Sequence, residues 1–225
     1  MTSDTGWHAL RFEGVHLAFD TPSGPTEVLR GINVTVPLDG ITAVVGPSGS
    51  GKSSILRLCN RLEVPTSGHI TLDGTDLADL DPLALRRRVG MVFQRPVLFA
   101  GTVADNLAVA APGIDTDPAA GAAALARCGL GADLLDRTAD QLSGGEAQRM
   151  CLARTLCTDP EVVLMDEVTS SLDPAARATI EALATELTAD GIAVLWVTHD
   201  HDQARRIAQR TVVVDDGVVV AVEQS

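Results

Sequence analysis

The segment Gly46-Pro47-Ser48-Gly49-Ser50-Gly51-Lys52-Ser53 decides how this chain folds. It has the spacing G-x-x-x-x-G-K-S, the apolar stretch 41–45 precedes it, and a helical pattern of apolar residues follows it. A glycine-rich turn between a strand and a helix directs backbone N–H groups toward phosphates, and the helix N-terminus adds partial positive charge. The segment therefore predicts a phosphate-binding loop, or P-loop. The candidate nucleotide-binding residues are Gly46 to Ser54. Among them we expect Lys52 to contact the β- and γ-phosphates and the Ser53 hydroxyl to bind Mg²⁺.

Two acidic residues, Asp166 and Glu167, directly follow the apolar stretch 162–165. Such a stretch is typical of a buried strand in a parallel sheet, and these sheets bind their ligands at the carboxyl ends of the strands. We expect Asp166 to hold the Mg²⁺ shell and Glu167 to orient or deprotonate an attacking water. The pair predicts that the bound nucleotide is hydrolysed.

The composition excludes several classes of protein. Of the 225 residues 45% are hydrophobic, which is enough for a packed core, and the net charge of −13 makes nucleic acid an unsuitable main partner. No apolar run reaches membrane-spanning length, and residues 1–5 lack the basic start of a signal peptide. The four cysteines form no C-x-x-C pair, so we expect reduced core thiols in a cytoplasm.

The order of apolar segments predicts an α/β fold of the P-loop NTPase type. Short β-rich segments at 10–19, 28–36 and 41–45 are followed by alternating helical and strand patterns, which favours an N-terminal antiparallel β lobe and a parallel-sheet core. The alanine-rich stretch 101–141 predicts a small α-helical insert, and a further helix is expected from about residue 147. We expect one domain over 8–222, with lobe and core in about 8–93 and 151–222 and the insert in about 95–150.

The segment Leu142-Ser143-Gly144-Gly145-Glu146 resembles the signature motif of the ATP-binding cassette (ABC) ATPases. Family members usually have Gln at position 146. The substitution has a physical account, because Ser143-x-x-Glu146 is a capping box, in which Glu and Gln serve equally. In the family, two cassettes dock head to tail, so the resemblance implies that Ser143, Gly144 and Gly145 contact nucleotide bound to the P-loop of a second chain.

Three more positions are similar to the family. Gln94 matches the glutamine that senses Mg²⁺ and the attacking water, and His199 matches the histidine that contacts the γ-phosphate. Asp173 matches an interface loop, and it is equally a plain helix N-cap before Pro174. The resemblance thus implies catalytic roles for Gln94, Glu167 and His199, metal contacts for Ser53, Gln94 and Asp166, and nucleotide contact for Asp173.

The family usually stacks adenine on an aromatic ring of the N-terminal lobe, commonly Tyr. This chain has no Tyr, and Phe19 occupies the matching place. Stacking needs the ring and not the hydroxyl, so Phe19 is the candidate platform. The alternative is a core phenylalanine at the end of a strand.

The resemblance implies ATP and Mg²⁺ as cofactors and a homodimer as the active species. It also implies a separate transmembrane permease, and thus a peripheral place on the cytoplasmic face of the plasma membrane. We expect the permease contact near residues 94–99, unless Leu98 and Phe99 simply pack inside the helical insert.

The cargo is the least defined expectation. Segments 99–107 and 192–200 look similar to small bacterial cassettes of phosphate import or iron export. A soluble ABC ATPase of iron-sulfur assembly type is the alternative function, whereas residues 95–141 are too few for the long coiled coils of the DNA-repair branch.

Replacing Lys52 by alanine should remove most of the affinity for ATP, because a cation that contacts the β- and γ-phosphates is lost. Equilibrium titration of the Lys52→Ala variant with labelled ATP measures this. Unchanged affinity would contradict the P-loop assignment.

Overall fold

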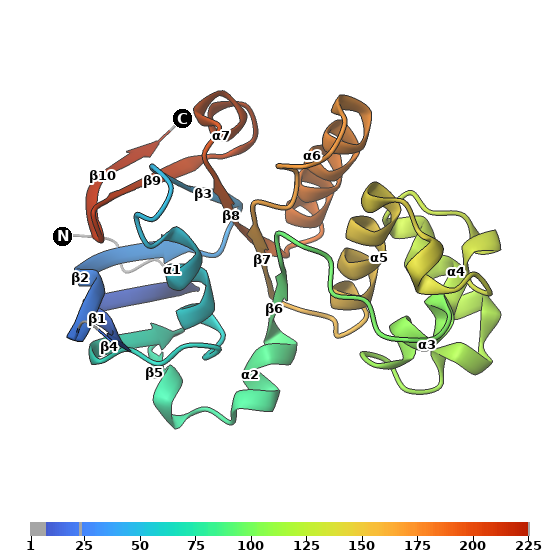
Figure 1. Ribbon diagram of the computed structural model, residues 1–225, viewed down its shortest axis with the longest axis horizontal. Coiled ribbons are helices and arrows are strands. Elements are labelled where there is room, and N and C mark those ends of the chain that lie inside the picture. Colours follow the sequence, from blue (N-terminus) through green and yellow to red (C-terminus); the bar gives the residue numbers. More distant parts are fainter. Residues whose placement is uncertain (1–7, 23, 225) are drawn as a thin grey trace.

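Two sheets organise the chain in the computed structural model, which describes residues 8–22 and 24–224 (Figure 1). The first is an antiparallel lobe with the order β2-β1-β4-β5, and the second has the order β10-β9-β3-β8-β7-β6. Strands β3, β6, β7, β8 and β9 are parallel, and only β10 runs antiparallel to its neighbour. The predicted fold, an antiparallel lobe joined to a parallel core, is confirmed. The lobe contains β1 (Ala9–Thr21), β2 (Gly24–Pro37), β4 (Ser67–Leu72) and β5 (Thr75–Asp76), and the core contains β3 (Ile41–Val45), β6 (Val89–Val92), β7 (Val162–Asp166), β8 (Ala193–Thr198), β9 (Arg210–Asp215) and β10 (Val218–Gln224).

Seven α-helices connect these strands within the described residues. They are α1 (Lys52–Cys59), α2 (Pro82–Arg88), α3 (Val103–Ala108), α4 (Pro118–Arg127), α5 (Gly144–Leu156), α6 (Pro174–Ala189) and α7 (His201–Ile207). Helices α3, α4 and α5 gather at one end of the molecule, beside α6 and away from the β lobe (Figure 1). Helix α5 begins three residues before the predicted start at 147 and continues through residue 150, so the expected edge of the insert falls inside a helix.

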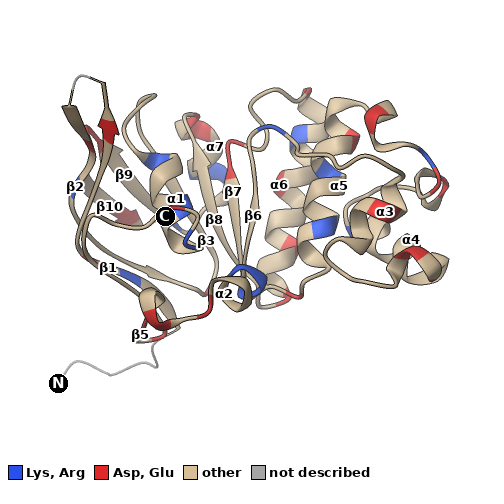
Figure 2. Cartoon of the chain, turned by 60° about the horizontal axis from the view of Figure 1, so that its bottom comes forward, with Lys and Arg blue, Asp and Glu red and all other residues tan. Residues whose placement is uncertain are grey.

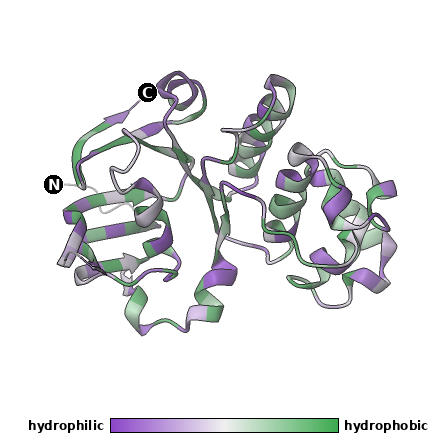
Figure 3. Cartoon of the chain, in the orientation of Figure 1, coloured by the Kyte–Doolittle hydropathy of each residue, from purple (hydrophilic) through white to green (hydrophobic). Residues whose placement is uncertain are grey.

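The strands of the parallel sheet alternate between two hydrophobic cores. Ile41, Ala43 and Val45 of β3 belong to one core, whereas Val44 belongs to the other. This period of two is what a strand buried on both faces requires. In Figure 3 the central strands are accordingly coloured mostly green.

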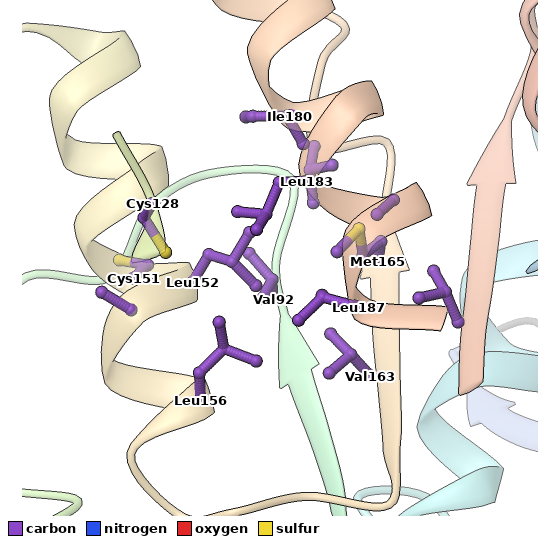
Figure 4. Packing of buried hydrophobic residues seen from close by; sticks show 14 of the residues in the cluster. Val92, Cys128, Cys151, Leu152, Leu156, Val163, Met165, Ile180, Leu183 and Leu187 are labelled. Atoms are coloured by element: carbon purple, nitrogen blue, oxygen red, sulfur yellow. The ribbon is translucent and has the colours of Figure 1, made fainter. Parts of the chain in front are cut away.

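The core on one face joins the sheet to the helices. Figure 4 shows Leu152 and Leu156 of α5 pointing toward Leu183 and Leu187 of α6, with Val163 of β7 beside them. The other core joins the sheet to α1 and the antiparallel lobe. The parallel sheet is therefore packed on one face against the helices and on the other face against α1 and the antiparallel lobe.

Cysteine thiols are buried in both cores and free of disulfides. Burial raises the pKa of the Cys59 and Cys128 thiols to about 12, which makes them poor nucleophiles at neutral pH. In the described part of the chain, no helix combines the length and the apolar character needed to cross a bilayer.

Candidate functional site

Glycine is required at both ends of the P-loop. A Cβ on Gly46 would overlap the carbonyl oxygen of Val214 on β9, so the loop lies directly against the sheet. Gly51 has a left-handed φ of 98° and caps α1, and a Cβ there would lie 2.5 Å from Cδ2 of Leu29. The turn from β3 into α1 is thus fixed by packing on two sides.

Lys52 is a buried cation held by carbonyl oxygens. Its side chain lies in the first turn of α1, and its Nζ donates to the oxygens of Gly46 at 2.9 Å and Pro47 at 2.7 Å. Burial lowers the pKa of this ammonium group, while the charges of Glu167 and Asp166 oppose that shift. A buried ammonium group without a directly bonded carboxylate suits the binding of an anion.

Ser53 and Asp166 form the candidate Mg²⁺ site. The Ser53 hydroxyl donates to Oδ1 of Asp166 at 2.8 Å. Burial raises the pKa of Asp166, against the hydrogen bond from Ser53, so a bound cation would relieve the cost of this buried charge. Hydroxyl and carboxylate oxygens are ligands that Mg²⁺ accepts. No group of three His, Cys, Asp or Glu side chains suited to a metal occurs among the described residues.

The three predicted catalytic residues meet at one oxygen atom. Oε2 of Glu167 lies 3.2 Å from Nδ1 of His199 and 3.4 Å from Nε2 of Gln94. Glu167 itself has a left-handed φ of 47°, and its backbone N–H donates to the oxygen of Val197 on β8. Such a conformation costs a non-glycine residue about 1–3 kcal/mol and is frequent at functional sites.

A pocket of about 460 Å³ joins the P-loop to this cluster. Phe19 contributes to it from β1 and is 41% exposed, so it is no core residue. Val28 on β2 also lines the pocket, although its place within an apolar strand pattern carries no signal for this. The lining residues are Phe19, Val28, Ser48, Gly49, Gly51, Lys52, Ser53, Ser54, Gln94 and Glu167.

Ser143, Gly144 and Gly145 do not line this pocket. They lie at the exposed N-terminus of α5, which is separated from α1 by β7 and α6 (Figure 1). The capping box is formed, because the backbone N–H of Ser143 donates to Oε2 of Glu146 at 2.8 Å and the Ser143 hydroxyl accepts from the backbone N–H of Glu146 at 3.3 Å. These hydrogen bonds hold the pKa of Glu146 below its usual value.

Asp173 caps α6 through its carboxylate, which accepts from the N–H groups of Ala175 at 2.9 Å and Ala176 at 3.0 Å. The helix N-cap expected for Asp173 is therefore present.

Ser170 was missing from the prediction, and its hydroxyl lies 3.5 Å from Nε2 of Gln94. A serine in a loop gives no sequence signal for that contact.

Comparison with known proteins identifies the family. The model of the ABC transporter family matches residues 29–170, which is more than half of the chain. The chain belongs to this family. Protein STAR1 of Oryza sativa subsp. japonica is 44% identical over 87% of this chain, and ABC transporter I family member 17 of Arabidopsis thaliana is 42% identical over 88%. Methionine import ATP-binding protein MetN 2 of Burkholderia mallei is 40% identical over 94%.

The chain spans only part of these relatives: 58% of the length of STAR1, 76% of the Arabidopsis protein and 56% of MetN 2. Solved ABC cassettes are matched almost end to end. The dimer of the ATP-binding cassette MJ0796 in a post-hydrolysis state with ADP and Pi has a TM-score of 0.85 and 28% identity, covering 96% of this chain and 98% of that one. CbiO1 from Clostridium perfringens, part of the transporter complex cbiONQ, has a TM-score of 0.83 and 28% identity, covering 98% and 89%.

Phe19 provides a test of the pocket. If adenine stacks on this ring, Phe19→Ala should weaken ATP binding by roughly 1–3 kcal/mol, with little change in thermal stability, and Phe19→Tyr should be nearly neutral. Nucleotide titrations beside thermal melts of both variants measure this. A large loss of stability with unchanged affinity, the pattern of a core residue losing about 3–5 kcal/mol, would contradict the assignment.

Proposed function

We propose that this chain binds and hydrolyses ATP as the nucleotide-binding subunit of an ABC transporter. The observation that carries the proposal is the convergence of Gln94 and His199 on the Glu167 carboxylate. Glu167 and Gln94 line one pocket with Lys52 and Ser53. Similarity to the cassette MJ0796, solved with ADP and Pi, supports the reaction class.

Each residue has a role that its contacts support. Lys52 binds the outer phosphates, and Ser53, Asp166 and Gln94 would hold Mg²⁺, which when bound neutralises phosphate charge. Glu167 accepts the proton of the attacking water at its carboxylate, and His199 and Gln94 keep that carboxylate in place and contact the γ-phosphate and the water. The water oxygen attacks the γ-phosphorus, the bond to the leaving phosphate oxygen breaks, and ADP and phosphate leave.

We propose a head-to-tail homodimer as the active species. The P-loop and the α5 N-terminus lie in different parts of one chain, so Ser143, Gly144 and Gly145 can reach a bound nucleotide only in a second chain. Their exposed helix N-terminus offers backbone N–H groups and partial positive charge to a phosphate. The dimeric structures of MJ0796 support this arrangement.

We propose that the permease contacts a groove to which Phe99, five residues after Gln94, contributes. It has a volume of about 270 Å³, and its apolar lining includes Phe99, 45% exposed, and Val109, 59% exposed. Leu98 packs against the core, as the alternative expected, but Phe99 does not. Exposed apolar side chains in a groove suit the binding of a protein partner, and Phe99 follows Gln94 of the hydrolysis site by five residues of sequence.

The charge at this groove indicates what the partner presents. The guanidinium of Arg154 lies 4.8 Å above the Phe99 ring, and Arg86 borders the groove from α2, the helix whose last turn is blue in Figure 2. Both donate to uncharged oxygens, and no carboxylate of the described residues lies within ion-pair distance of either. A permease segment that carries an apolar side chain and a carboxylate would complement this groove, placing the chain on the cytoplasmic face of the membrane.

We propose phosphate import or iron export as the transport process. The segments 99–107 and 192–200 support these two, and the name of MetN 2 adds methionine import as a third candidate. A soluble ATPase of iron-sulfur assembly type remains the alternative function. Copurification of the chain with a membrane permease from native membranes favours the transporter, and recovery without any membrane partner favours the alternative.

Glu167→Gln should keep ATP binding and lower the hydrolysis rate by at least about 10²-fold, because the proton acceptor is removed while the side chain keeps its shape. ATP-bound dimer should accumulate. Turnover of the purified variant and its size by light scattering with ATP measure both effects, and near-normal turnover would refute the role of Glu167.

Mixing two inactive variants tests the composite site. Lys52→Ala chains lack a working P-loop and Ser143→Arg chains lack a working α5 N-terminus, so a heterodimer retains one intact site. Hydrolysis should be nearly absent in each variant alone and should partly return on mixing. No recovery in mixtures shown to form heterodimers would contradict the head-to-tail arrangement.

Phe99→Ala should reduce copurification with the permease, because it removes the exposed apolar lining of the groove, while hydrolysis by the isolated chain persists. Val220→Ala is the control, since Val220 is 56% exposed but lies on edge strand β10. Equal copurification of both variants would place the permease elsewhere.

A further inference from the structure

Gln203 connects the elements that carry Glu167 and His199. It lies on α7, one turn after His199, and is 2% exposed. Its Nε2 donates to the Thr169 hydroxyl at 2.9 Å and to Oε1 of Glu181 at 2.8 Å. A carboxylate only accepts hydrogen bonds, so the contact with Glu181 fixes which way the amide faces. Both amide protons are thereby used, as a buried amide requires.

The first of these bonds reaches the turn that carries Glu167. Thr169 is buried and lies two residues after Glu167, whose left-handed backbone is strained. A strained conformation persists only where surrounding contacts over-determine it. Within the turn, the backbone N–H of Ser170 donates to the backbone carbonyl oxygen of Glu167 at 3.0 Å. Gln203 adds a hydrogen bond to this turn from helix α7, through the Thr169 hydroxyl.

The second bond ties α7 to α6. Glu181 of α6 also accepts from Arg206 of α7 at 2.8 and 3.1 Å, so one carboxylate receives two side chains of the same helix. The backbone N–H of Gln203 donates to Asp200, the N-cap that follows His199. Gln203 therefore fixes the start of α7 by its backbone and its side chain together.

Gln203 also lines the same hollow as the two groups that it would align. Glu167, His199 and Gln203 line one hollow of about 40 Å³, where Nδ1 of His199 is 3.2 Å from Oε2 of Glu167. We propose that Gln203 is a positioning residue that holds the Glu167 turn and the His199 loop in register for hydrolysis. This inference rests on the proposed ATP hydrolysis. A residue that merely joined α6 to α7 would affect stability and leave the rate per folded molecule unchanged.

The test uses Gln203→Leu and Thr169→Val, near-isosteric changes that remove the donor and the acceptor of the same hydrogen bond. We expect each to lower kcat at saturating ATP by roughly 10- to 100-fold, since small misplacements of catalytic groups have effects of this size. ATP affinity should change less than about twofold, because neither residue lines the pocket that contains the P-loop. The double variant should lose no more than the worse single variant, because both changes break one shared bond.

Two further variants separate positioning from stability. Thr169→Ser keeps the hydroxyl and should retain turnover. Arg206→Gln breaks the ion pair with Glu181 but leaves both bonds of Gln203, so it should lower the melting temperature without lowering kcat. If Gln203→Leu does not fold, Thr169→Val against Thr169→Ser decides the question alone.

Normal kcat in folded Thr169→Val or Gln203→Leu overturns the proposal, and so does a double variant whose loss is the product of the single losses. Wild-type protein that hydrolyses no ATP refutes the proposed function instead, and the positioning role with it. Wild-type turnover that Glu167→Gln abolishes shows that hydrolysis belongs to this site, so a failure of the Gln203 variants to lower it concerns Gln203 alone.

Discussion

Parallel pairing of four adjacent strands, in the order β6, β7, β8 and β3, is the constraint on which the site depends. Parallel neighbours end at the same edge of a sheet, so whatever follows each strand is brought together there. Gln94 follows β6, Glu167 follows β7, His199 follows β8, and the P-loop follows β3. Loops that are far apart in sequence thus meet because each is attached to a rigid, buried strand.

Burial of charge is the cost of this arrangement. Lys52 and Asp166 are each about 5% exposed. Burial lowers the pKa of Lys52 and raises the pKa of Asp166, so both shifts favour the neutral form of the side chain. Each charge is held in part by an uncharged partner: carbonyl oxygens for Lys52 and the Ser53 hydroxyl for Asp166. A site of this kind gains stability when phosphate and a cation arrive, because the ligands replace the solvation that folding removed.

The main elements could be predicted because strong local signals agree with the fold. The P-loop spacing, the apolar runs at 162–165 and 192–197, the acids after the first run and His199 after the second indicate the parallel sheet and its functional edge. The residues at which helices end are harder to predict from the sequence. Leu62 continues the apolar pattern of α1, yet α1 ends at Cys59 because Arg61 turns left-handed with φ 55°, and Leu62 is left 42% exposed. Tertiary contacts such as that of Gln203 with Thr169 join separate elements by side-chain geometry, for which a sequence contains no periodic signal.

Helix α5 has a different kind of contact at each end. Its N-terminus presents Ser143, and near its C-terminus Arg154 lies over Phe99 at the groove. Thirteen helical residues span about 20 Å at 1.5 Å per residue, and a hydrogen-bonded helix with a packed face changes little in length. A displacement of one end is therefore transmitted to the other end, so α5 mechanically couples a partner docked at its N-terminus to a partner bound in the groove.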